Sequence, residues 1–258
     1  ILPGIESRRH SYGELRDQFG ELTRPDSGSG PWPVAVLIHG GFWRERYDLR
    51  LEDRLVADLA DRGWAVWNLE YRRVGRRSQG GWPATVEDVA AGIDHLAGLD
   101  EPLDTDRVVA IGHSAGGQLG LWAAARPGLP PGAPGADPAV TLSAVVAQSG
   151  LVDLREAARL GLSGGATEQF LGGSADELPD RYDIASPIER LPLKVPLLLV
   201  HGDADDVVPV DIARRYALHA AVAGDPCAPV ELAGCGHMEH LDPRSEAWSR
   251  VTGWLEER

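Results

Sequence analysis

The residues best suited to chemistry lie at positions 112–116, which read Gly-His-Ser-Ala-Gly. Residues 106–112, which contain the apolar run Val-Val-Ala-Ile, predict a strand, and the residues from Ser114 to about Arg126 predict a helix. A serine between two glycines suits a sharp turn from strand to helix, because larger side chains at the glycine positions would collide with the backbone. The pattern predicts an outward-held nucleophile at Ser114, and the alternative interpretation is an ordinary Gly-Ser turn.

A serine hydroxyl is a weak nucleophile and requires a base, which in turn requires an orienting acid. We expect the acid to follow the serine along the chain, and the base to follow the acid. His237 fits best, because it lies in a glycine-rich loop after the last predicted strand. His240 is its rival, His219 falls within a predicted helix, and His201 precedes the acid candidates.

The acid is expected within residues 201–209, which read His-Gly-Asp-Ala-Asp-Asp-Val-Val-Pro and begin at the end of a predicted strand. We select Asp205 for its position in the loop at this strand end. Asp203 could instead brace the turn, and Asp206 could cap the helix that follows. Both neighbours stay open as alternative acids.

Backbone donors for a developing oxyanion are predicted within residues 39–43, which read His-Gly-Gly-Phe-Trp and follow a predicted strand. Glycines let backbone N–H groups approach a substrate closely, and donors aimed at the oxyanion contribute strongly to catalysis. We assign the N–H of Gly41 or Phe42, together with that of Ala115. The alternative is a plain Gly-Gly turn followed by two core aromatic residues.

Several side chains near the strand ends are predicted to line a substrate pocket. For Trp82 and Trp122 an ordinary structural role is an equally good interpretation. The predicted lining residues are Phe42, Trp43, Trp82, His113, Trp122 and Met238.

The elements that must position these residues alternate between short apolar runs and longer amphipathic stretches. This alternation predicts an α/β fold, with a mostly parallel central sheet and helices on both faces. Residues 9–23 predict an antiparallel lead-in hairpin, 127–138 a loop, and 151–190 two or three short helices that form a small cap. The predicted strands are 33–39, 64–70, 106–112, 140–148, 193–201 and 229–232. The predicted helices are 50–62, 83–97, 114–126, 209–223 and 243–257.

The composition narrows the class of protein. A chain of 258 residues fits a single domain, residues 1–258, and a net charge of −14 argues against nucleic acid or an anionic membrane as partner. The two cysteines match no zinc spacing, so we expect neither a disulfide framework nor a metal. The N-terminal residues show no basic region followed by an apolar stretch, which predicts no signal peptide and a cytoplasmic location. The oligomeric state is left open.

Together, the motifs at 39–43, 112–117, 201–209 and His237 resemble those of the α/β-hydrolase superfamily, in particular its esterases and prolyl-oligopeptidase-like catalytic domains. Residues 39–43 also match the H-G-G-x-W pattern of kynurenine formamidases, whereas the acid segment is similar to the general esterase and peptidase type. The resemblance implies a serine hydrolase that forms an acyl-enzyme without a cofactor. A small carboxylic ester is the first expected substrate, an aryl-formamide or another small amide the second, and a short peptide the third. A non-catalytic member of the fold that binds a ligand or a protein is the remote alternative.

Overall fold

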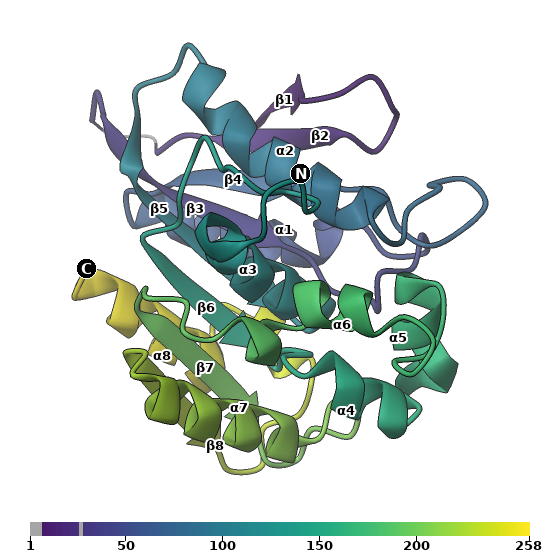
Figure 1. The fold of residues 1–258 in the computed structure, drawn as a ribbon. Helices are drawn as coiled ribbons and strands as arrows, with labels where there is room; N and C mark the ends of the chain where they lie inside the picture. Colours follow the sequence, from purple (N-terminus) through teal and green to yellow (C-terminus); the bar gives the residue numbers. More distant parts are fainter. Residues whose placement is uncertain (1–6, 26–27) are drawn as a thin grey trace.

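The computed structural model describes residues 7–25 and 28–258, and within them one eight-stranded sheet forms the centre of the fold (Figure 1). The strands are β1 (Ser7–Ser11), β2 (Phe19–Thr23), β3 (Trp32–Ile38), β4 (Ala65–Leu69), β5 (Leu103–His113), β6 (Ala144–Gln148), β7 (Leu197–Gly202) and β8 (Cys227–Leu232). The α-helices are α1 (Asp53–Asp61), α2 (Ala84–Asp94), α3 (Ala115–Ala125), α4 (Leu154–Arg159), α5 (Leu162–Leu171), α6 (Pro179–Ala185), α7 (Val210–Ala223) and α8 (Glu246–Glu256).

The order of the strands in space is β1-β2-β4-β3-β5-β6-β7-β8. β1 and β2 form an antiparallel hairpin, β2 is antiparallel to β4, and the remaining neighbours are parallel. Both the lead-in hairpin and the mostly parallel sheet are therefore confirmed. The carboxyl ends of the parallel strands meet at one edge of the sheet, where ligands of such folds bind. The loops that leave this edge after β3, β5, β7 and β8 carry the predicted motifs.

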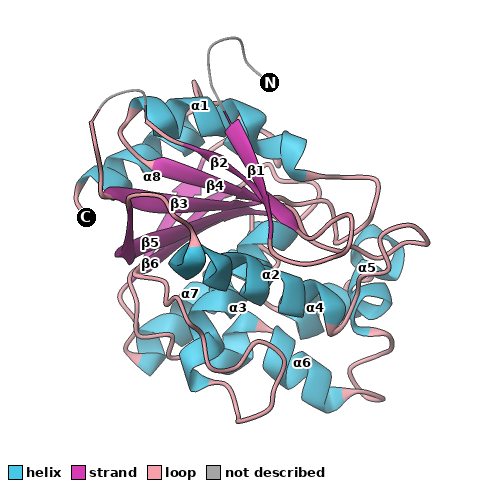
Figure 2. Cartoon of the chain, turned by 90° about the horizontal axis from the view of Figure 1, so that it is seen from above, coloured by secondary structure: helices cyan, strands magenta, loops and turns pink. Residues whose placement is uncertain are grey.

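Two layers of helices enclose the sheet, as Figure 2 shows. Helices α1 and α8 pack on one face, while α2, α3 and α7 pack on the other. Strand β3 shows how its sequence requires both layers: Val34, Val36 and Ile38 join one core, whereas Ala35 and Leu37 join the other. Strands buried on both faces are typical of parallel sheets, and they read as continuous apolar runs.

Strand β6 begins at Ala144, later than the predicted 140. The N–H groups of Ala139 and Val140 both donate to Asp94 Oδ1 at 3.0 Å. These groups are unavailable for a sheet ladder, so the apolar run enters the sheet only after them.

Strand β7 begins at Leu197 rather than at the predicted Leu193, for a similar reason. The N–H groups of Leu193 and Lys194 donate to the carboxylate of Asp225, each at 2.7 Å. Lys194 has φ +63, which bends the chain away from an extended conformation.

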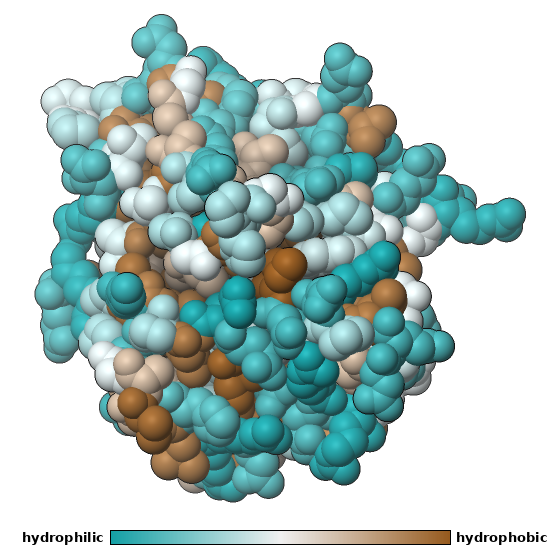
Figure 3. Space-filling view, in the orientation of Figure 1, coloured by the Kyte–Doolittle hydropathy of each residue, from teal (hydrophilic) through white to brown (hydrophobic). Residues whose placement is uncertain are grey.

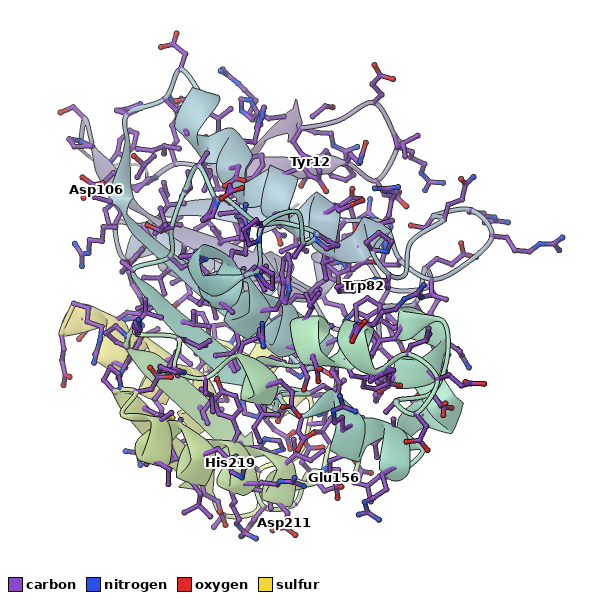
Figure 4. The ribbon with its side chains drawn as sticks, viewed as in Figure 1. Tyr12, Trp82, Asp106, Glu156, Asp211 and His219 are labelled. Atoms are coloured by element: carbon purple, nitrogen blue, oxygen red, sulfur yellow. The ribbon has the colours of Figure 1, made fainter. Side chains whose placement is uncertain are left out.

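The segment 151–190 contains α4, α5 and α6, in agreement with the prediction of short helices. It lies beside the loops at the carboxyl edge of the sheet (Figure 1). Two contacts join α5 to these loops: the rings of Trp43 and Phe170 stack with centroids 4.4 Å apart, and Trp82 N–H donates to Phe170 O at 2.8 Å. Figure 4 shows Trp82 next to this segment.

The face seen in Figure 3 is largely hydrophilic, with an apolar patch over α7 that includes the exposed Leu218 and Val222. Among the described residues, no helix has the length and apolar character needed to cross a bilayer. The expectation of an absent signal peptide concerns mainly residues 1–6, which lie outside the described residues.

Candidate active site

Ser114 occupies a strained turn between β5 and α3. Its φ of +57° and ψ of −118° are values that a non-glycine residue adopts only where the surrounding structure imposes them. A Cβ on Gly112 would lie 2.1 Å from Gly116 O, and a Cβ on Gly116 would lie 1.8 Å from Ile38 O. The turn therefore requires both glycines, and the predicted strand–turn–helix context of the serine is present.

The hydroxyl of Ser114 is buried and has no partner within the described part of the chain. The Ser114 N–H, in contrast, donates to Gln148 O at 2.8 Å, which fixes the backbone of the turn. Buried polar groups are nearly always hydrogen-bonded, so an unpaired hydroxyl in a strained turn indicates a functional group rather than a structural one.

His237 and Asp205 meet from the loops that follow β8 and β7. His237 Nδ1 lies 2.8 Å from Asp205 Oδ2. Because a carboxylate only accepts hydrogen bonds, Nδ1 donates, and the Nε2 of the neutral ring is left to accept a proton. The two loops approach closely at Gly202, where a Cβ would lie 1.9 Å from Cys235 O.

His113 joins the serine turn to the loop of His237. Its Nε2 donates to His237 O at 2.8 Å, and the two rings have centroids 4.6 Å apart. Through His113, which directly precedes Ser114, the serine turn is joined to the loop of His237, which in turn pairs with Asp205. Burial, followed by the proximity of His237 and His240, holds the pKa of His113 well below its ordinary value. Its ring is therefore neutral and acts as a fixed hydrogen-bond donor.

Asp205 is held by more contacts than the sequence alone indicates. Its Oδ1 accepts the N–H groups of Val207 and Val208 at 2.9 and 2.8 Å, and its Oδ2 lies 3.3 Å from His201 Nε2. Burial alone would raise the pKa of Asp205, but the nearby His201 ring and the hydrogen bonds from His237 and the Val208 N–H outweigh it and lower the pKa well below its ordinary value. Chain order excludes His201 as the base, but its spacing of four residues from Asp205 is a sequence signal for the proximity of the two side chains.

The two alternative acids have other positions. Asp203 Oδ1 accepts the Gly234 N–H at 2.6 Å, so this aspartate braces the loop after β8, in line with the alternative role considered for it. Asp206 is exposed and does not cap α7 with its side chain. Within the described residues, neither is hydrogen-bonded to His237.

His240, the rival base, is buried and paired with another group. Its Nε2 lies 2.8 Å from Ser149 Oγ, and its backbone carbonyl accepts from Gln148 Nε2 at 3.3 Å. Burial, followed by the proximity of His201 and His237, lowers the pKa of His240 to about 3. The ring is therefore neutral at pH 7 and lies against a serine rather than an aspartate.

This lowered pKa predicts acid-sensitive folding. An unfolded histidine titrates near pH 6.5. Between about pH 6.5 and 3, the unfolded chain therefore binds more protons at His240 than the folded chain does. The free energy of unfolding should fall as the pH falls through this window, by up to about 1.4 kcal/mol per pH unit from this residue, and the effect should vanish above the window.

Urea unfolding at several pH values between 7.5 and 4 measures this slope. His240→Asn should give a flatter dependence than the wild type. The matched control is His219→Asn on the exposed side of α7 (Figure 4), which should leave the slope unchanged. An equal slope in the wild type and His240→Asn would contradict the assignment.

The loop 39–43 passes directly beside the serine. A Cβ on Gly40 would lie 2.9 Å from Ser114 Cβ, and Gly41 has φ +108°, a conformation that favours glycine. Within the described part of the chain, the N–H groups of Gly41, Phe42 and Ala115 donate to no other backbone carbonyl. The residues predicted as oxyanion donors therefore lie on the two segments that meet at Ser114.

A cluster of buried polar side chains holds the start of the loop 39–43 in place. His39 Nε2 lies 3.1 Å from Glu70 Oε1, and its Nδ1 lies 2.8 Å from Gly40 O. The Tyr71 hydroxyl donates to His39 O at 2.7 Å, and Arg73 pairs with Glu70 at 3.2 Å. Sequence reasoning missed Glu70, although a glutamate directly after a buried strand was the available signal.

The predicted pocket residues Trp43 and Trp122 lie among the buried residues of the core. Both indoles are fully buried. Phe170 covers one face of Trp43, whose Nε1 donates to Gln118 Oε1 at 3.0 Å. Trp122 packs under a surface loop, where a Cβ on Gly135 would lie 2.5 Å from its ring. The side chains of Trp43 and Trp122 therefore both pack into the core.

His113 is 2% exposed, and its ring is hydrogen-bonded to the His237 loop. Phe42 and Trp82 are partly buried, and Met238 is 56% exposed. The pocket roles of all six residues stay predictions. Across residues 7–25 and 28–258, no group of three or more His, Cys, Asp or Glu side chains is arranged as a metal site.

The sheet order, the serine turn and the His237–Asp205 pair at the carboxyl edge define the α/β-hydrolase fold predicted from the sequence. Residues 21–219 match the family described as BD-FAE, and the chain belongs to this family.

Two curated relatives come from Mycobacterium tuberculosis. Esterase LipC is 28% identical over 249 residues, which cover 90% of this chain and 60% of LipC. The probable carboxylic ester hydrolase LipM is 29% identical over 216 residues, which cover 80% of this chain and 49% of LipM. The chain therefore spans about half to three-fifths of the length of these relatives.

Solved esterase structures share the fold. A truncated carbohydrate esterase from gut microbiota has a TM-score of 0.84 at 22% identity, covering 98% of this chain and 95% of its own. The thermophilic esterase Est2 of Thermogutta terrifontis has a TM-score of 0.76 at 22% identity, covering 99% and 91%. The family and these similarities confirm the resemblance to α/β-hydrolase esterases, while the resemblance to kynurenine formamidases stays a prediction.

Proposed function

We propose that this chain is a serine esterase that hydrolyses small carboxylic esters through an acyl-enzyme on Ser114. The observation that carries the proposal is the pairing of His237 Nδ1 with Asp205 Oδ2 at 2.8 Å, beside an unpaired serine hydroxyl in a strained turn. The names of the relatives, an esterase and a probable carboxylic ester hydrolase, support the same reaction class.

The first half of the reaction transfers the acyl group to the enzyme. Ser114 Oγ forms a bond to the ester carbonyl carbon while its proton passes to His237 Nε2, and the carbonyl electron pair moves onto the oxygen. The N–H groups of Gly41 or Phe42 and of Ala115 stabilise this oxyanion. When the carbonyl re-forms, the bond to the alcohol oxygen breaks, and His237 gives that oxygen its proton.

The second half repeats these steps with water. His237 takes a proton from a water molecule, whose oxygen attacks the acyl carbon, and the proton returns to Ser114 Oγ as the acid departs. Asp205 keeps the Nδ1–H of His237 pointed toward itself and stabilises the imidazolium that forms in each half. Its low pKa suits this role, because the carboxylate stays ionised beside the cationic ring.

The burial of the site supports a small substrate. Ser114 is 2% exposed and His237 is 7% exposed, so little beyond a carbonyl group and its nearest substituents can reach the hydroxyl. We further propose that residues 1–258 act as a single α/β-hydrolase domain, with 151–190 as a small cap. A cytoplasmic location stays a prediction from the sequence.

The proposed preference for esters over formamides has a direct test. An ester alcohol departs with less help than an amide nitrogen, which needs well-timed protonation by His237. The Trp43 indole is also fully buried, with Phe170 stacked on one face, so neither face is exposed for an aryl-formamide to stack on. We expect kcat/KM for phenyl acetate to exceed that for N-formylkynurenine by at least about tenfold, or about 1.4 kcal/mol in the activation free energy.

A tenfold advantage for N-formylkynurenine would replace the esterase assignment with an arylformamidase. Failure to turn over any phenyl or p-nitrophenyl ester, formamide or small aminoacyl-arylamide would instead favour the remote alternative, a ligand-binding member of the fold.

A further inference from the structure

The oxyanion loop is tied to α5 through Arg44, a residue that no motif singles out. The Arg44 N–H donates to Gly41 O at 3.1 Å and so closes the turn that presents the oxyanion donors. Its guanidinium donates from Nη1 to Ser163 Oγ at 3.0 Å, and from Nη2 to Ser163 O at 2.6 Å and Gln169 Oε1 at 3.3 Å. One residue thus joins two segments that are more than a hundred positions apart in the chain.

The part of α5 that Arg44 contacts is an unusual turn. Ser163, Gly164 and Gly165 have φ values of +50°, +67° and +75°, all in the left-handed region. Ser163 is not a glycine, so its conformation is strained and needs support from outside the turn. Arg44 supplies that support at Ser163, and Gln169 Nε2 supplies more by donating to Gly164 O at 3.1 Å.

A second contact, between Trp43 and Phe170, also joins the loop 39–43 to α5. The rings of Trp43 and Phe170 stack at an interplanar angle of 8°, and Gln118 Oε1 accepts a hydrogen bond from Trp43 Nε1. Gln118 Nε2 also donates to Ala185 O at 2.8 Å, which ties the start of the serine helix to the end of α6. The Trp43–Phe170 pair sets the distance between α5 and the loop 39–43. The hydrogen bonds of Arg44 to Ser163 hold the start of α5 against the same loop.

We infer that Arg44 is a positioning residue, which sets the oxyanion donors of Gly41 and Phe42 by anchoring their loop to α5. This inference rests on the proposed function and adds a role for the 151–190 segment. The position of α5 and the geometry of the oxyanion hole are then coupled. A substrate that contacts α5 and shifts it would therefore change kcat through Arg44, as well as changing the binding affinity.

The test compares an oxoester with the thionoester of the same acid and alcohol. Sulfur is larger than oxygen and accepts hydrogen bonds weakly, so a thionoester gains little from well-placed N–H donors. A variant with a displaced oxyanion loop should therefore lose activity on the oxoester and keep most of its activity on the thionoester. A variant that merely loses folded protein should lose both equally.

For Arg44→Leu, we expect kcat on the oxoester to fall by about 10-fold to 100-fold, because small displacements of catalytic groups cost rates of this order. KM should change by less than about 3-fold, and the ratio of oxoester to thionoester kcat/KM should fall by at least about 5-fold. Arg44→Lys keeps a cation able to reach the Ser163 carbonyl and should restore part of the ratio.

Two further variants keep the test informative if Arg44→Leu folds poorly. Gln169→Leu removes support from the α5 side without altering the oxyanion loop, and it should lower the ratio by a smaller factor. Arg159→Leu is the matched control, because Arg159 forms its ion pair with Glu156 on α4 at 2.6 Å, away from the loop. It should leave the ratio and kcat within about 2-fold of the wild type, as exposed ion pairs contribute little.

The inference is overturned if folded Arg44→Leu and Gln169→Leu both keep the wild-type ratio, even when their rates fall. It is supported if the ratio falls in either variant but not in Arg159→Leu. A wild-type protein that hydrolyses neither ester overturns the proposed function itself, which is a different result from an active wild type with an unchanged ratio.

Discussion

Ser114→Ala is expected to lower kcat for ester hydrolysis by about 10⁴-fold or more, with the fold intact. The loss follows because, in the proposed mechanism, Ser114 Oγ forms the bond to the carbonyl carbon. The fold should survive, because Ser114 Oγ makes no hydrogen bond within the described residues and its removal leaves no partner unsatisfied. Thermal unfolding and p-nitrophenyl ester turnover measure the two effects.

Ser149→Ala is the matched control for this change. Ser149 follows the parallel strand β6, is fully buried and has φ +47°, so it resembles Ser114 in position and backbone. Its hydroxyl, however, is paired with His240. We expect this variant to keep at least about a tenth of the activity, since only hydrogen-bond energy is lost. Substantial turnover by Ser114→Ala would remove Ser114 as the nucleophile.

Asp205→Asn should lower kcat by about 10⁴-fold, because an amide can donate to Nδ1 and so favour the wrong tautomer of His237. The same change also removes the charge that stabilises the imidazolium. Asp203→Asn and Asp206→Asn should each cost less than about 10-fold, since neither contacts His237 within the described residues.

Steady-state kinetics of the three variants, with circular dichroism to check folding, separates the acids. Asp203→Asn has a structural cost of its own through Gly234, so its stability is measured alongside. A greater loss of kcat in Asp203→Asn or Asp206→Asn than in Asp205→Asn would move the acid to that position.

The sequence predicted the features that depend on short-range rules. Ser114 was identifiable because a tight turn needs glycines two residues on either side, and those clashes are local. His237 and Asp205 were identifiable because parallel strands deliver their following loops to one edge of the sheet. The β1–β2 hairpin was readable from its alternation of polar and apolar residues.

Features set by tertiary packing were not predictable in this way. The stacking of Trp43 on Phe170 depends on where α5 lies, and the contact of Arg44 with Ser163 joins residues 119 positions apart. Local sequence also does not distinguish an aromatic residue that faces the core from one that faces the substrate. Chain order excludes His201 as the base, but it does not predict that His201 lies beside Asp205.

The most direct test of the central claim is covalent labelling with a fluorophosphonate, followed by intact-mass measurement and peptide mapping. A nucleophile activated by His237 should give one adduct per chain, located on Ser114, with loss of ester turnover in proportion to labelling. The adduct should be absent from Ser114→Ala and much slower to form in Asp205→Asn. An adduct on another residue, or full turnover by a chain labelled at Ser114, would contradict the account.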